Sequence, residues 1–143
     1  MNLPRLNCLV GLILVLTCLG CQANVAPPTT AGSEAAARQH FQDEFQKWMA
    51  GEKNQVSTME SRLKNALAPI SYNIRSIVKD SPDPLAFDSA KDLPPDWKDW
   101  PAYRVNVGVE FKSKAGTPVE KISTYRVTWN AAEAKWYIAE RFE

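Results

Sequence analysis

The longest amphipathic pattern in the chain follows Ser33 and has the period of an α-helix. The Ser33 hydroxyl suits the N-cap position, and Glu34 suits the positive end of the helix dipole. Asp43 and Lys47 are spaced to form an ion pair across one turn, and Gly51 is expected to end the helix. We therefore predict a helix over residues 34–50. Its buried face should consist of Ala37, Phe41, Phe45, Trp48 and Met49.

A second, weaker helical pattern runs from about Ser57 to Leu67. The sequence Ser57-Thr-Met-Glu60 has the form of a capping box, and apolar side chains at Met59, Leu63, Ala66 and Leu67 share one face. Pro69 is expected to end this segment, because proline cannot continue a helix. The pattern favours a second short helix.

Beyond Pro69 the apolar period changes to alternate residues, which is typical of strands with one buried face. Turn-forming sequences at residues 114–116 and 130–133 should join the last three segments into a meander. The chain is therefore expected to form an α+β domain, with the N-terminal helix packed on a four-stranded antiparallel sheet. The expected buried strand positions are Ile70, Tyr72, Ile74 and Val78; Tyr103, Val105, Val107, Val109 and Phe111; Tyr125, Val127 and Trp129; and Trp136, Ile138 and Phe142.

The N-terminal segment has the features of an export signal. Arg5 precedes an uncharged apolar run from Leu6 to Gly20, and polar residues follow at once. A basic start, an apolar middle of this length and a small residue at the end are typical of a secretory signal peptide. An uncleaved membrane anchor is the alternative, but a spanning helix needs about 20 apolar residues, which is more than this run provides.

The end of this signal resembles that of the bacterial lipoproteins. In that family a short box ends in Gly or Ala followed by the Cys that receives the lipid, and here the stretch is Cys18-Leu19-Gly20-Cys21. Cys18 stands where Leu is usual, and Leu19 is larger than the usual small residue. The resemblance implies cleavage before Cys21 and lipidation of Cys21. Ordinary signal cleavage remains the alternative, because Cys18-x-Gly20 also has small residues at the required spacing.

The three Cys are Cys8, Cys18 and Cys21, so cleavage before Cys21 would leave a single thiol and no disulfide. Residues 22–33 are small, polar and contain two Pro, which is typical of a flexible tether. We therefore divide the chain into a signal peptide at 1–20, a lipidated Cys and tether at 21–33, and one α+β domain at 34–143.

Charge and composition exclude several classes of function. The 17 Lys and Arg include Arg5 as the one charge of residues 1–33, so the remainder balances the 16 acidic residues. A balanced domain lacks the basic face that nucleic acid or anionic lipid would need. The single His, His40, lies inside the predicted helix, so we expect neither a nucleophile–base triad nor a zinc site. No cofactor-binding motif is present, and we predict no cofactor.

The segment from Asp80 to Pro101 is long for a connection in a compact domain. It holds six Asp, but their irregular spacing without a Gly does not fit a calcium loop. Trp97 and Trp100 stand close together in it. They are candidate partner contacts, because exposed Trp side chains stack on sugars or anchor a protein partner. Alternatively, one or both cover the open end of the helix–sheet core.

The order of a helix followed by an antiparallel sheet resembles cystatin-like and nuclear-transport-factor-like domains, and the helix ending Phe45-Gln-Lys-Trp48-Met-Ala-Gly51 looks like helices of small exported bacterial domains. These layouts host both enzymes and binding modules. An isomerase-like pocket would need an acid on the buried face, for which Glu140 is the candidate. A tyrosine would work with that acid, namely Tyr72, Tyr103 or Tyr125.

The function that these observations favour is a non-catalytic interaction domain of the bacterial cell envelope. It would be exported and tethered to a membrane through Cys21, at the periplasmic face or the cell surface, and would contact an envelope protein. The alternatives are a small-molecule or glycan binder using Trp97 and Trp100, and, less favoured, the pocket enzyme.

Overall fold

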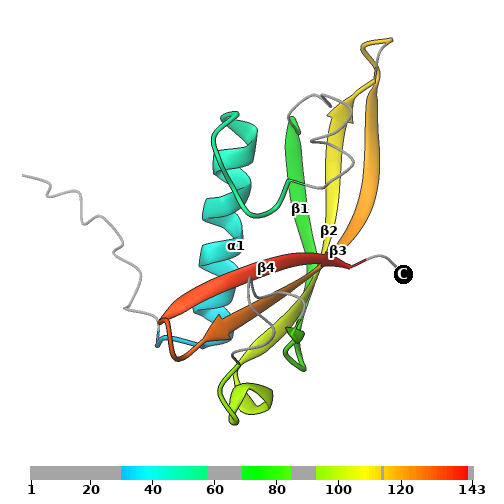
Figure 1. The fold of residues 1–143 in the computed structure, drawn as a ribbon. Coiled ribbons are helices and arrows are strands. Elements are labelled where there is room, and N and C mark those ends of the chain that lie inside the picture. The colour runs from blue at the N-terminus through cyan, green and yellow to red at the C-terminus, as the bar shows by residue number, and fades with distance from the viewer. Residues whose placement is uncertain (1–29, 58–68, 85–92, 114, 142–143) are drawn as a thin grey trace, which may run out of the picture.

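The computed structural model describes residues 30–57, 69–84, 93–113 and 115–141. One helix packs against an antiparallel sheet of four strands in the order β1-β2-β3-β4 (Figure 1). The predicted α+β layout and meander are confirmed. The predicted second helix and Phe142 fall outside the described residues. The elements are α1 (Glu34–Met49), β1 (Ser71–Asp80), the short 3-10 helix η3 (Trp97–Asp99), β2 (Ala102–Lys112), β3 (Pro118–Asn130) and β4 (Lys135–Arg141).

Both ends of α1 follow from local sequence. The Ser33 side chain accepts a hydrogen bond from the Ala36 N–H at 3.2 Å, as an N-cap should. At the other end Gly51 adopts a φ of +75°, which glycine reaches without steric cost. The Gly51 N–H then donates to the Trp48 carbonyl at 3.0 Å, and the Glu52 N–H donates to the Lys47 carbonyl at 2.8 Å. This pair of bonds is a Schellman motif, so both predicted ends are confirmed.

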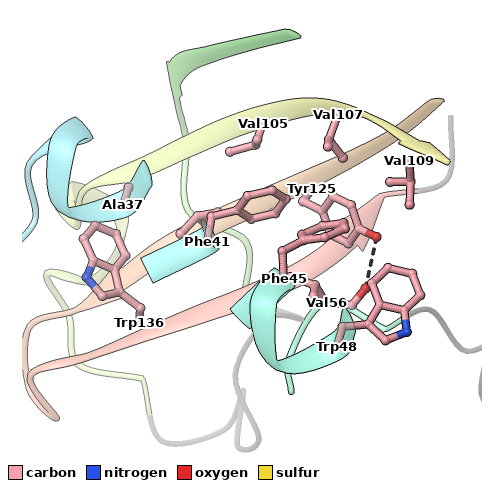
Figure 2. Close-up of a cluster of buried hydrophobic side chains, with 11 residues drawn as sticks. Ala37, Phe41, Phe45, Trp48, Val56, Val105, Val107, Val109, Tyr125 and Trp136 are labelled. Carbon is pink, nitrogen blue, oxygen red and sulfur yellow. Dashed lines mark hydrogen bonds between the residues drawn. The ribbon is translucent and has the colours of Figure 1, made fainter. Parts of the chain in front are cut away.

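The core lies between α1 and the sheet and is rich in aromatic rings (Figure 2). The Phe45 ring lies 5.2 Å from that of Phe41, 5.3 Å from that of Trp48 and 4.5 Å from that of Tyr72. Of the predicted helix face only Met49 is half-buried rather than buried. The buried cluster comprises Ala37, Phe41, Phe45, Trp48, Val56, Val105, Val107, Val109, Tyr125, Val127 and Trp136.

One strand departs from the predicted alternation. The register of β1 against β2 shifts between Ile74 and Ser76, which is a β-bulge that leaves Arg75 without a partner residue in β2. An extra residue exchanges the two faces of the strand beyond it. Ile77 therefore packs on the core, while Val78 lies on the opposite face and is 41% exposed. The predicted burial of Val78 is wrong for this reason. The predicted burial of Ile70 is also wrong, because Ile70 precedes the strand and is 42% exposed.

The face of the sheet away from α1 is not solvent-exposed along its whole length. At the end where β2 begins, Ala102 and Thr128 are fully buried, and Arg126 is 6% exposed. These three residues alternate with the core positions of β2 and β3, so they face away from α1. The prediction that only one face of the sheet is buried is therefore wrong at this end.

Candidate functional site

A groove of about 400 Å³ runs between α1 and the edge strand β1. Its volume is in the range of ligand-binding clefts. Tyr72 and Ile74 contribute partly buried apolar surface that continues into the core. Arg38 and Gln42 supply its polar side chains from α1, whereas the Asn73 side chain alternates with Tyr72 and Ile74 and faces away from α1. The exposed lining of this groove is more polar than apolar, which favours a ligand with polar or charged groups.

The polar groups of this groove are available to a ligand. Within the described ranges, the side chains of Arg38, Gln42 and Asn73 make no hydrogen bond or ion pair. Arg38 is the one charged residue of the lining. A guanidinium beside the Gln42 amide favours an anionic group, above all a carboxylate or phosphate, which it can hold through two parallel hydrogen bonds. Arg38 and Gln42 lie within the predicted helix, but the sequence pattern does not mark them as site residues, because a groove depends on which strand packs beside the helix.

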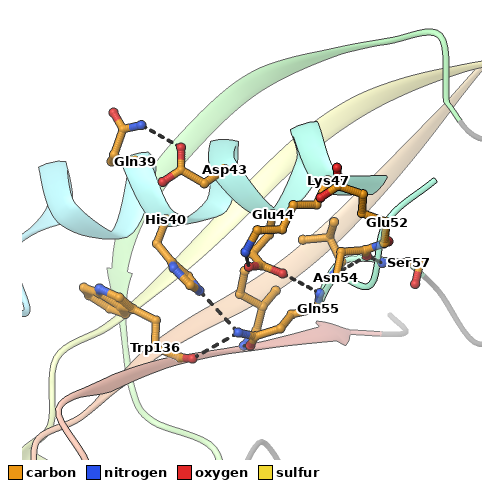
Figure 3. A network of polar contacts seen from close by, with 12 residues as sticks. Gln39, His40, Asp43, Glu44, Lys47, Glu52, Asn54, Gln55, Ser57 and Trp136 are labelled. Atoms are coloured by element: carbon orange, nitrogen blue, oxygen red, sulfur yellow. Dashed lines mark hydrogen bonds and ion pairs between the residues drawn. The ribbon is translucent and has the colours of Figure 1, made fainter. Parts of the chain in front are cut away.

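On the other side of α1, a polar network ties residues 52–57 to the helix and to β4 (Figure 3). Glu44 is 3% exposed. Its Oε2 accepts a hydrogen bond from the Gln55 N–H at 2.7 Å, and its Oε1 accepts one from Lys47 Nζ at 2.6 Å. The predicted Asp43–Lys47 pair is therefore wrong: Lys47 pairs with Glu44, and Asp43 accepts from the Gln39 amide at 2.8 Å.

The side-chain amide of Gln55 binds the outer edge of β4. Its Oε1 accepts from the Ile138 N–H at 3.1 Å, and its Nε2 donates to the Trp136 carbonyl at 3.4 Å. The amide thus occupies the position that a residue of a fifth strand would take. Unpaired strand edges invite pairing with other chains, so Gln55 closes this edge of the sheet.

His40 lies at the same junction and is half-buried, as expected for a residue at the boundary of the core. Its ring stacks on that of Trp136 at 6.4 Å. Burial lowers the pKa of His40 below its ordinary value, although the nearby Glu44 carboxylate acts in the opposite direction. The Gln55 amide nitrogen lies 3.4 Å from Nε2 and can only donate, which matches a neutral imidazole.

The end of the predicted tether is docked on the sheet. The Tyr103 hydroxyl donates to the Gly32 carbonyl at 2.9 Å, and Gly32 is buried with a φ of +78°. A Cβ on Gly32 would lie 2.9 Å from Pro101 Cγ and 3.4 Å from Trp129 Cδ1. Gly32 therefore belongs to the folded domain, and the chain enters that domain at a fixed point.

The two Trp residues of the long connection have different environments. Trp100 is 5% exposed and does not belong to the cluster beneath α1. This burial favours the alternative in which the Trp100 side chain has a structural role, and a partner contact at Trp100 stays a prediction. Trp97 in η3 is half-buried, and Lys98 Nζ lies 5.9 Å from its ring centroid. A partner contact at Trp97 stays a prediction.

Ion pairs fix the start of the long connection, at Asp80 and Asp83, to Arg126 of β3. The Arg126 side chain, 8% exposed, lies 3.1 Å from Asp80 Oδ2 and 3.0 Å from Asp83 Oδ2. Burial acts to raise the pKa of Asp80, but hydrogen bonds from the Ser81 N–H and from Arg126 outweigh it and lower that pKa below its ordinary value. These two carboxylates therefore neutralise a buried guanidinium.

The hydroxyls of two of the three candidate tyrosines of an isomerase-like pocket are bonded within the fold. The Tyr125 hydroxyl donates to the Val56 carbonyl at 3.0 Å, and the Tyr103 hydroxyl bonds to Gly32. Glu140 pairs with Tyr125 in the register of β3 and β4. Burial and the Glu140 charge raise the pKa of Tyr125 above its ordinary value. A hydroxyl with that pKa stays protonated and acts as a donor to backbone.

Cys21 and most of the tether lie outside the described residues. None of the helices in the described part of the chain has the length and apolar character needed to cross a bilayer. In the same ranges, no three His, Cys, Asp or Glu side chains come together as ligands for a metal ion.

Comparison with protein-family models, with curated proteins and with solved structures finds no match to this chain.

Proposed function

We propose that this protein is an exported, lipid-anchored domain that binds another component of the cell envelope without catalysing a reaction. The membrane would hold it through Cys21, at the periplasmic face or the cell surface. The observation that carries binding is the groove between α1 and β1, in which the side chains of Arg38 and Gln42 have no partner among the described residues. A guanidinium without a partner in a surface groove is a candidate for recognition of an anionic group.

The course of the chain supports the anchoring part of this proposal. Sequence similarity to lipoproteins ends at Cys21, a polar tether follows, and Gly32 is packed between Pro101 and Trp129. A tether of this length spans at most about 40 Å. The folded domain would therefore work close to the bilayer, where an envelope partner is within reach.

Replacement of the anchoring residue tests the proposal. We expect Cys21→Ser to leave the membrane fraction or to keep its signal peptide, because no other segment of the sequence offers attachment. The wild-type N-terminal peptide should be heavier than its sequence by a diacylglycerol unit. Cys8→Ser is the matched control, since it removes a thiol from the signal run and leaves residues 18–21 intact. An unmodified mature N-terminus on a protein that washes off with buffer would refute anchoring.

The alternative of a glycan-binding surface built from Trp97 and Trp100 is less favoured. Stacking on a sugar needs an exposed ring face, and Trp100 has none to offer at 5% exposure. The isomerase alternative is also less favoured, because the hydroxyls of Tyr103 and Tyr125 are bonded to backbone carbonyls.

A further inference from the structure

The two edge strands of the sheet, β1 and β4, differ in whether a side chain binds their outer backbone groups. β4 is closed by Gln55, whose amide takes the hydrogen bonds that an added strand would take at Trp136 and Ile138. β1 is the other edge, and among the described residues no side chain bonds to its outer backbone groups in this way. Edge strands present unpaired N–H and C=O groups, and an open one serves as a template for pairing.

The regular part of β1 that could accept a strand is short. Ser71 to Ile74 pair in register with Glu110 to Val107, and the bulge at Arg75 ends this register. The Arg75 side chain lies on the sheet face away from α1, where its Nη2 is 2.7 Å from Glu120 Oε1. Bulges limit pairing at sheet edges, so an added strand would use about four residues here.

The groove lies along this same stretch. Tyr72, Asn73 and Ile74 line it from β1, and Arg38 and Gln42 line it from α1. A strand added to Ser71–Ile74 would therefore place alternate side chains toward α1, where Arg38 supplies the one charge. A carboxylate is the complementary group.

We propose that β1 and the α1–β1 groove bind an extended peptide segment of the envelope partner, which pairs with Ser71–Ile74 and places a Glu or Asp side chain against Arg38. The inference rests on the proposed function for the location of the partner, but the binding site itself requires only the folded domain. Backbone hydrogen bonds would supply much of the affinity, and the Arg38–carboxylate pair would supply the preference for sequence.

Selection from a displayed library of random heptapeptides on the mature protein tests this inference. We expect enriched sequences to carry an acidic residue at one fixed position. A selected peptide should shift the backbone amide signals of Ser71–Ile74, and its Glu→Gln form should bind about tenfold more weakly. Arg38→Gln should remove that tenfold difference. Arg104→Gln is the matched control, because Arg104 is an exposed arginine on the opposite face of the sheet.

Several outcomes would overturn the inference: no enrichment, enriched peptides without an acid, equal binding by the Glu and Gln peptides, or shifts confined to another surface. Shifts of the groove amides by oligomers of N-acetylglucosamine but not by peptides would identify a glycan site instead. These outcomes are independent of Cys21. A protein that stays membrane-bound but binds no acidic peptide loses only this inference, and one that binds the peptide but washes off the membrane loses only the anchor.

Discussion

Phe41 and Phe45 join the helix to the sheet at the centre of the molecule. Both are fully buried, and both rings contact that of Tyr125, with centroid distances of 5.3 and 6.3 Å. We expect Phe41→Ala to lower the free energy of unfolding by about 3–5 kcal/mol, a large part of the stability of a small domain. Denaturant unfolding measures this, with exposed Gln46→Ala as the control, expected within about 0.5 kcal/mol of wild type. Equal midpoints for both variants would mean that α1 does not pack as described.

Gly32 and Gly51 have nearly the same backbone conformation but different surroundings. Their φ angles are +78° and +75°, but a Cβ would touch Pro101 only at Gly32 and would find nothing within 4 Å at Gly51. Gly51→Ala should therefore cost about 1 kcal/mol for the left-handed conformation alone. Gly32→Ala should cost more, because Pro101 must also move. Thermal unfolding of the two variants compares them, and equal losses would show that Gly32 is not docked.

The His40 imidazole predicts a dependence of stability on pH. Its pKa is lowered in the folded protein, so the unfolded chain binds a proton first as the pH falls below about 6.5. The free energy of unfolding should therefore decrease between about pH 6.5 and the folded pKa of His40, and this slope should vanish in His40→Gln. Denaturant unfolding over this range measures the effect. A wild-type stability that rises as the pH falls would contradict it.

Sequence pattern was informative for residues whose role is local. The apolar stripe of α1 and its two caps could be predicted because each depends on neighbours within one turn. Glu44 was not singled out as buried, because its burial depends on the Gln55 N–H, which lies 11 residues further along the chain. Arg38 was missed as a site residue because the groove exists only once β1 lies beside α1.

At the scale of elements, alternation located four strands, but it could not locate the bulge in β1. A bulge adds one residue to a strand without changing its composition, so the pattern assigned Val78 to the face that Ile77 occupies. The burial of Arg126 on the other face was missed for a related reason: it depends on Asp80 and Asp83, which lie more than 40 residues earlier in the chain.

The closure of β4 by Gln55 makes a prediction at this scale. Gln55→Ala should expose the Ile138 N–H, so its amide hydrogen should exchange faster, and the free energy of unfolding should fall by about 1 kcal/mol. Gln39→Ala is the control, because the Gln39 amide bonds to Asp43 in an exposed pair on α1. Unchanged exchange at Ile138 in Gln55→Ala would show that another group closes this edge.

At the scale of the whole molecule, the docked Gly32 would set which end of the domain faces the bilayer under the proposed anchoring through Cys21. Gly32 contacts Pro101 and Trp129, next to the turn between β3 and β4, whereas the β2–β3 turn near Ala115 is at the far end of β2 (Figure 1). A strand of this length extends about 35 Å.

Under the proposed anchoring, this arrangement predicts an average orientation of the domain on the membrane. A fluorophore on Lys135→Cys should be quenched by spin-labelled lipid headgroups more strongly than one on Ala115→Cys. Both positions are exposed, and Cys21 is the only other Cys of the mature chain under the proposed cleavage. Equal quenching at the two positions would mean that the domain has no preferred orientation on its tether.

The docking of Gly32 also has a mechanical consequence. Under the proposed anchoring, tension between the lipid and a bound partner would enter the domain at Gly32, directly before the Ser33 cap and α1. The Tyr103 hydroxyl and the contacts with Pro101 and Trp129 would pass part of that force to the beginning of β2 and the end of β3, where a ladder of backbone hydrogen bonds shares it. The first turn of α1 would then carry less of the load than it would if the tether continued directly into the helix.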